Sequence, residues 1–164
     1  RLPAEALDRG ELDMVLGRFD HVPARFTRQL WRSETLRVAV CQDHPRLSDG
    51  LDLQRFLQLR HVWVHGGQTR GMVDQWLAEQ NLVRQIVYTT PNYLQAAHLV
   101  AATELCVVLP TLLAQQFARL LPLKLYELPF ALPPFDLELV RLTHRQHDPA
   151  LTWLEAQILA IQPG

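Results

Sequence analysis

Strand-like and helix-like segments alternate along the chain, and this alternation restricts the fold more than any other feature of the sequence. Between residues 53 and 128, each short apolar run of strand type is followed or preceded by a stretch with helical spacing. The expected strands are 61–64, 85–89, 105–109 and 124–128, and the expected helices are 53–59, 72–79, 93–102 and 112–120. Such alternation predicts an α/β fold with mostly parallel sheets.

The segments on either side of this middle part read as fragments of a second sheet. They contain expected helices at 4–10 and 149–160 and expected strands at 12–17, 26–30, 35–41 and 135–142. Turn-forming residues at 44–50 and prolines at 129, 133 and 134 interrupt the pattern. We therefore predict two lobes, the first formed by residues 1–44 with 130–164 and the second by residues 45–129.

Charge and composition argue against a nucleic-acid-binding surface on this chain. Its 164 residues carry 16 Lys and Arg against 17 Asp and Glu, a formal net charge of -1, whereas such a surface needs clustered excess base. No apolar stretch approaches the roughly 20 residues that cross a bilayer. Cys41 and Cys106 both lie in apolar runs and are expected to stay reduced, which favours a cytoplasmic protein. The chain starts at Arg1 rather than Met, so the natural N-terminus is expected upstream.

Catalytic and metal-binding patterns are not found. Ser33 and Ser48 both lack the Gly-x-Ser-x-Gly setting of a nucleophilic serine. His144, His147 and Asp148 are close enough in sequence to share a metal ion, but the stretch runs from a strand into a turn, which favours a solvated turn. The sequence therefore predicts no enzyme, no metal and no cofactor.

Turns that lead from a strand into a helix are the candidate binding features. Backbone N–H groups in the glycine-rich turn 66–71 can hold an anion, or the glycines can simply ease the turn. The turn 89–92 is of the same kind, and there Asn92 can equally act as a helix cap. Both follow the carboxyl ends of strands, where ligands bind in open α/β sheets. Arg18 also follows a strand and can hold a carboxylate or remain a surface arginine. Trp76 and Trp153 are expected in the core.

Several motifs in order resemble the effector-binding domain of LysR-type transcription regulators. The stretch 4–17 is similar to the family pattern "L..G.LD.ALG", and 36–47 is similar to "L.VVV...HPL". Further similarity lies in strand 62–64, in helix end 99–103 and in 106–110, which resembles "V..G.G...LP" of the Nod-like, aromatic-responsive branch. The end at 148–154 also looks like that branch. The resemblance covers essentially the whole chain.

The resemblance implies a two-lobed, type 2 periplasmic-binding-protein-like fold with two mixed sheets and a ligand cleft between the lobes. It implies that the effector is a small organic acid, with aromatic acids as one candidate class. It also implies DNA binding through a winged helix-turn-helix domain that is expected outside this chain. The linker helix and the first strand and helix of the first lobe are likewise expected outside it. The chain is expected to form a homodimer or homotetramer, with helix 4–9 near helix 72–79 of another copy. RNA polymerase is a further expected partner. No contact with a membrane is expected. The candidate effector-binding residues are Arg18, Phe19, His65, Gly66, Gly67, Thr69, Pro91, Asn92 and Thr111.

Two other functions stay open from the sequence alone. A periplasmic-type solute-binding protein would share the expected fold, and a signal peptide on the full gene would favour it. A small α/β enzyme is disfavoured because no nucleophile and base stand together. A helix-turn-helix encoded upstream of Arg1 would favour the regulator.

Overall fold

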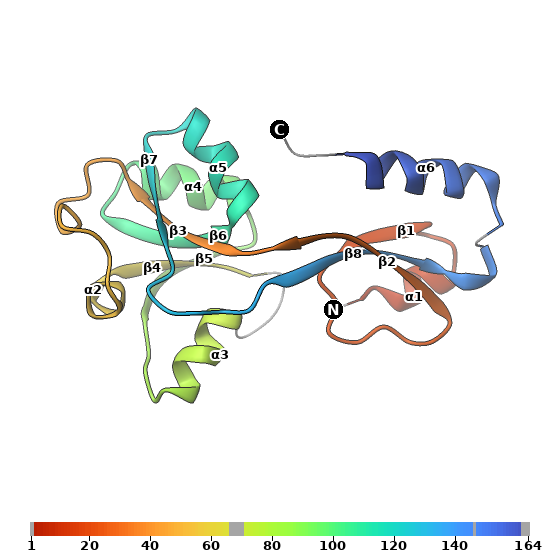
Figure 1. Ribbon diagram of the computed structural model, residues 1–164, viewed down its shortest axis with the longest axis horizontal. Coiled ribbons are helices and arrows are strands. Elements are labelled where there is room, and N and C mark those ends of the chain that lie inside the picture. The colour runs from red at the N-terminus through yellow and green to blue at the C-terminus, as the bar shows by residue number, and fades with distance from the viewer. Residues whose placement is uncertain (1, 66–70, 146, 162–164) are drawn as a thin grey trace. The chain divides into compact units, whose positions relative to one another are not determined.

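The computed structural model describes residues 2–65, 71–145 and 147–161, and the chain divides into two compact units. Unit 1 consists of Arg1–Glu34 and Pro134–Gly164, and unit 2 is Thr35–Pro133. Figure 1 shows the elements in chain order: α1 (Ala4–Asp8), β1 (Met14–Gly17), β2 (Phe26–Glu34), β3 (Leu36–Cys41), α2 (Leu53–Gln58), β4 (Arg60–Val64), α3 (Met72–Glu79), β5 (Gln85–Thr90), α4 (Tyr93–Ala101), β6 (Leu105–Pro110), α5 (Thr111–Leu120), β7 (Leu123–Glu127), β8 (Phe135–Leu142), a 3-10 turn (Thr143–Arg145) and α6 (Pro149–Ala160).

Strand pairing differs between the two units. In unit 2 the order is β5-β4-β6-β3-β7, with β4 parallel to β5 and β6 and β3 antiparallel to β6 and β7. In unit 1 the order is β1-β8-β2, and both pairs are antiparallel. The prediction of mostly parallel sheets is therefore wrong, and of the two mixed sheets that the resemblance implies, the one in unit 2 is mixed and the one in unit 1 is antiparallel. No helix connects β1 to β2 or β2 to β3, so these segments lack the crossovers that parallel pairing requires.

Helices cover both faces of the sheet of unit 2, with α4 and α5 on one face and α2 and α3 on the other (Figure 1). The core under α4 and α5 includes Val62, Val100 and Val107, and the core under α2 and α3 includes Phe56 and Leu77. All five are at most 1% exposed, and full burial of such side chains contributes about 1.5–3 kcal/mol each. No helix among the described residues is long and apolar enough to span a membrane.

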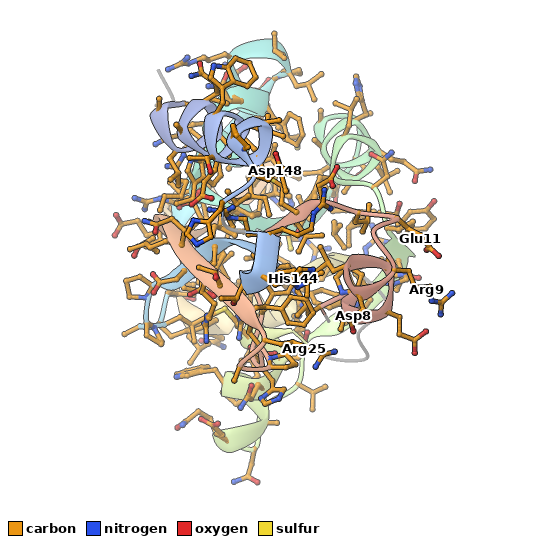
Figure 2. All side chains as sticks on the ribbon, turned by 90° about the vertical axis from the view of Figure 1, so that its right-hand side faces the viewer. Asp8, Arg9, Glu11, Arg25, His144 and Asp148 are labelled. Carbon is orange, nitrogen blue, oxygen red and sulfur yellow. The ribbon has the colours of Figure 1, made fainter. Side chains whose placement is uncertain are left out.

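Unit 1 holds its helices by a small core and by ion pairs. Leu7 of α1 is fully buried against Phe26 and Val140. Arg25 donates from Nε and Nη2 to the two carboxylate oxygens of Asp8 at 2.9 and 2.7 Å, and the two residues are labelled side by side in Figure 2. This fork-shaped contact ties the segment before β2 to the end of α1.

Few side chains of helix α6 are buried. Leu151 is its one buried residue, and Glu155 lies one turn further on, 2.6 Å from Nε of Arg141 on β8. That pair does not have hydrogen-bond geometry, so it acts as an ion pair. Trp153 is 64% exposed, so the prediction that it lies in the core is wrong. Helical spacing predicts an apolar face of a helix, but it does not show whether another element packs against that face.

The unit boundaries lie at 34/35 and 133/134, whereas the sequence suggested 44/45 and 129/130. Strand β3 belongs to unit 2 because it pairs with β6 and β7. The turn after it is a packed part of the same unit: Nε2 of His44 donates to the carbonyl of Glu104 at 3.1 Å, and its Nδ1 accepts from the N–H of Arg46 at 3.3 Å. Turn-forming residues there mark a tight turn and not a boundary between lobes.

A histidine and a cysteine form a buried polar contact in unit 2. His61 is fully buried, and its Nε2 lies 2.8 Å from the carbonyl of Phe56. A carbonyl only accepts, so Nε2 carries the proton and Nδ1 accepts from the thiol of Cys106 at 3.2 Å. Burial lowers the pKa of His61 to about 4 and raises the pKa of Cys106 to about 12. Both groups are neutral near pH 7.

The neutral His61 makes stability depend on pH. The unfolded chain protonates this histidine below about pH 6.5, whereas the folded chain does so only near pH 4. Stability is therefore full above pH 6.5 and falls as the pH is lowered toward 4, by about 3 kcal/mol for this group. Urea unfolding of the wild type and of His61→Gln at pH 7.5 and 4.5 checks this.

His61→Gln is the matched control because its amide can donate to the Phe56 carbonyl and does not titrate. Its free energy of unfolding should fall less between the two pH values than that of the wild type. Equal falls in the two proteins would contradict the prediction.

Candidate functional site

One edge of the sheet of unit 2 collects the predicted turns. Because β4 is parallel to β5 and β6, these strands end side by side at Val64, Thr90 and Pro110. Strand β3 begins at the same edge, since Leu36 lies opposite Pro110. Helices α4 and α5 also begin here, so their partial positive N-terminal ends lie at this edge. We call it the carboxyl edge.

The turn into α4 is organised by its own side chains. Oδ1 of Asn92 accepts from the N–H of Gln95 at 3.0 Å, which confirms the predicted helix cap. Oγ1 of Thr90 accepts from the N–H of Asn92 at 3.1 Å and donates to Oε1 of Gln95 at 2.6 Å. Thr90 is 2% exposed, whereas Pro91 and Asn92 are exposed. The buried threonine shapes the turn, and the next two residues lie on its surface.

The turn into α5 is joined to the start of β3 by two contacts. The N–H of Thr111 donates to the carbonyl of Thr35 at 2.9 Å, and the two threonine hydroxyls lie 2.7 Å apart. The N-cap residue Pro110 provides no side-chain hydrogen bond to this helix. Sequence reasoning selected Thr111 and missed Thr35, because the two are 76 positions apart and only the β3–β6 register brings them together.

The remaining predicted residues fall into three groups. His65 joins the carboxyl edge, where its N–H donates to the carbonyl of Thr90 at 3.1 Å and extends the β4–β5 pairing. Gly66, Gly67 and Thr69 lie outside the described residues. Arg18 and Phe19 belong to unit 1. The structure therefore brings together His65, Pro91, Asn92 and Thr111.

Arg18 and Phe19 follow strand β1 and have structural contacts of their own. Nη2 of Arg18 lies 3.2 Å from Oδ1 of Asp20, and its guanidinium carbon is 5.8 Å from the centre of the Phe135 ring. The arginine is exposed, so this ion pair is weak. Phe19 packs against the core of unit 1 and covers Gly17, where an added Cβ would stand 3.1 Å from its ring.

The carboxyl edge offers hydroxyl, amide and backbone donors. Among the described residues, no group of three His, Cys, Asp or Glu side chains could hold a metal ion. Asp148, one of the residues weighed as a metal ligand, instead caps α6 by accepting from the N–H groups of Ala150 and Leu151 at 3.0 and 3.4 Å. Donor groups beside two helix N-termini suit a small polar or anionic ligand.

Comparison with known proteins gives one family. The model of the LysR substrate binding domain matches residues 2–161. The HTH-type transcriptional regulator SyrM of Rhizobium meliloti (strain 1021) is 28% identical over 156 residues, which cover 94% of this chain and 48% of that protein. This chain thus spans about half the length of the curated relatives it matches.

Solved structures agree with the fold. A probable transcriptional regulator from Pseudomonas aeruginosa superposes with a TM-score of 0.89 at 28% identity, over 99% of this chain and 54% of that chain. The effector binding domain of BenM, solved with its effector benzoate, gives a TM-score of 0.71 at 22% identity, over 94% of this chain and 71% of that chain. The predicted two-lobed α/β fold of the periplasmic-binding-protein type is confirmed.

Removing the Asn92 cap should destabilise unit 2. Asn92→Ala leaves the N–H of Gln95 without its acceptor, and loss of such a cap costs about 1 kcal/mol. Asn92→Asp keeps a good capping oxygen and should unfold close to the wild type. Urea unfolding of the three proteins measures the difference. An alanine variant as stable as the wild type would show that the cap contributes nothing.

Proposed function

Because the chain belongs to the family of LysR substrate-binding domains, we propose that it is the effector-binding part of a LysR-type transcription regulator. The match over residues 2–161 is the observation that carries this proposal. The relatives reported above are named as transcriptional regulators and not as enzymes. That naming favours a regulator over the alternative of a solute-binding protein that feeds a transporter.

The proposed ligand is a small organic acid held at the carboxyl edge of unit 2. The N-termini of α4 and α5 provide the positive potential that a carboxylate needs. Hydroxyl and amide groups at Thr111 and Asn92 provide polar selectivity. A benzoate-bound BenM domain shares the fold, and this makes aromatic acids the first class to test. The contributions of Gly67, Thr69, Arg18 and Phe19 rest on the sequence.

The proposed activity is a shift between conformations and not a reaction. A ligand that binds one arrangement of the chain better than another shifts the population toward it. In the complete regulator this shift would alter how an attached helix-turn-helix domain holds DNA, in the cytoplasm. With a net charge of -1, the present chain is not expected to bind DNA itself. Contact with RNA polymerase stays a prediction.

Self-association is proposed on the open side of strand β5. This strand is at the edge of its sheet, and Ile86, Val87 and Tyr88 are 39%, 44% and 40% exposed. Val83, just before it, is 85% exposed. An exposed edge strand with apolar surface is a template for pairing with another chain. The strand follows α3 in the chain, the helix predicted to lie near α1 of another copy.

Binding of an organic acid should raise the melting temperature. A ligand that binds only the folded state at 100 times its Kd stabilises it by about 2.7 kcal/mol, which corresponds to several degrees for a chain of this size. Benzoate and salicylate are the first probes, followed by uncharged benzamide as the control for the carboxylate. No shift with any of a wide panel of acids would contradict the proposed ligand class.

Two variants locate the site. Arg18→Ala should abolish the shift while leaving the melting temperature without ligand nearly unchanged, because this exposed ion pair contributes little. Asn92→Asp keeps the α4 cap but adds negative charge at the carboxyl edge, so it should weaken acid binding. If Asn92→Asp responds fully, the ligand lies elsewhere; if only Arg18→Ala responds fully, the arginine has no part in the site.

Charge on strand β5 should weaken self-association. Val87→Lys places an ammonium group on the open edge, and edge lysines are known to oppose strand pairing. Leu120→Lys is the matched control, since Leu120 is 78% exposed at the end of α5, which packs over β7, β3 and β6. Sedimentation velocity over a concentration series measures both. A wild type that remains monomeric throughout, or equal effects of the two lysines, would contradict the proposed surface.

A further inference from the structure

Helix α3 is fixed at its start by contacts that leave little freedom. Arg84 donates from Nε and Nη2 to the two oxygens of Asp74, in the first turn of α3, at 2.7 and 2.8 Å. The arginine side chain is 1% exposed. At the residue before the helix, a Cβ on Gly71 would overlap with Cη2 of Trp63. A displacement at the start of this helix must therefore shift the side chains that pack against the helix.

The same helix carries a stacked contact to a distant segment of unit 2. The rings of Trp76 and Phe130 are parallel within 8°, with centroids 4.1 Å apart. The ring of Phe130 also meets Phe56 of α2 edge to face, at 5.5 Å. A stack of this kind contributes about 0.5–1.5 kcal/mol beyond the area it buries, and it is sensitive to sliding of either ring.

Phe130 lies in the segment 128–133 that leads from β7 to the boundary with unit 1; we call this segment the second crossover. It has neither helix nor strand, and Pro129 and Pro133 restrict its backbone. Leu128, Phe130 and Leu132 of this segment are partly buried against the core under α2 and α3. A pocket of about 220 Å³ separates it from Thr35, the single residue between β2 and β3, which we call the first crossover. Residues 35–37 line the other wall of that pocket.

We propose that the Trp76–Phe130 stack couples the start of helix α3 to the second crossover. A displacement at Gly71 moves a helix that is clamped by Arg84, and Trp76 then shifts Phe130. The pocket beside Phe130 gives the crossover room to move without compressing the core. The inference rests on the proposed function, because it gives an effector bound at the carboxyl edge a route to the strand that enters unit 1. Trp76 and Phe130 are positioning residues and touch no ligand.

The test needs no ligand, and amide chemical shifts provide the readout. Gly71→Ala displaces the start of α3 in the wild-type chain and in a Trp76→Leu chain. In the first, the amide signals of Ala131 and Leu132 should move; in the second, their movement should be smaller by about threefold or more. The signal of Val73 should move equally in both and shows that the displacement itself is unchanged. Glu79→Ala, at the exposed end of α3, should move neither crossover signal.

Equal movement of Ala131 and Leu132 in both backgrounds, or none in either, would overturn the inference. A stack that only stabilises the core would lower the melting temperature of Trp76→Leu without changing this transfer. If Gly71→Ala does not fold, Asp74→Asn is the second perturbation, since it releases the clamp to Arg84 and is read in the same way. Failure of benzoate or salicylate to bind leaves this result intact, so the two proposals fail separately.

Discussion

Strand β3 enters unit 2 between β6 and β7, and its antiparallel pairing with both determines what meets at the carboxyl edge. Val38, Val40 and Ala39 are fully buried on its two faces, so the register cannot slip by one residue without exposing one core and burying the wrong side chains in the other. The register places Leu36 opposite Pro110 and Arg37 opposite Glu127. The hydroxyl contact between Thr35 and Thr111 and the pocket between the crossovers both follow from this alignment.

On the α3 face of the sheet, the buried ion pair between Asp74 and Arg84 holds the first turn of helix α3. Burial raises the pKa of Asp74, but the hydrogen bonds and charge of Arg84 outweigh it, so the carboxyl pKa lies below its ordinary value. Nη1 of Arg84 has no hydrogen-bond partner among the described residues, so the guanidinium is tied to this one carboxylate. Removing one partner of such a pair costs about 3–5 kcal/mol. The first turn of α3 is therefore tied to the segment that leads into β5.

Local signals were sufficient for most elements and insufficient for their pairing. The predicted bounds of 72–79, 135–142 and 149–160 are those of α3, β8 and α6, because caps, glycines and apolar spacing act within a few residues. The cap at Asn92 was equally local. Pairing of β1 and β2 with β8, the exposure of Trp153 and the partner of Thr111 depend on distant residues, and Met14 of β1 lies opposite Arg141 of β8, more than a hundred positions away. No spacing within a single segment carries that information.

The two crossovers are held with unequal strength, and this difference gives the further inference its direction. The first is a single residue between β2 and β3, Thr35, whose carbonyl and hydroxyl both contact Thr111. Backbone pairing of β3 on both sides adds to this restraint. The second crossover has no strand pairing, and the ring of Phe130 is its main aromatic contact with the helices. Under the proposed coupling, a force that reaches both through unit 2 displaces the second crossover, because a ring slides on its neighbour at lower cost than a ladder of hydrogen bonds breaks.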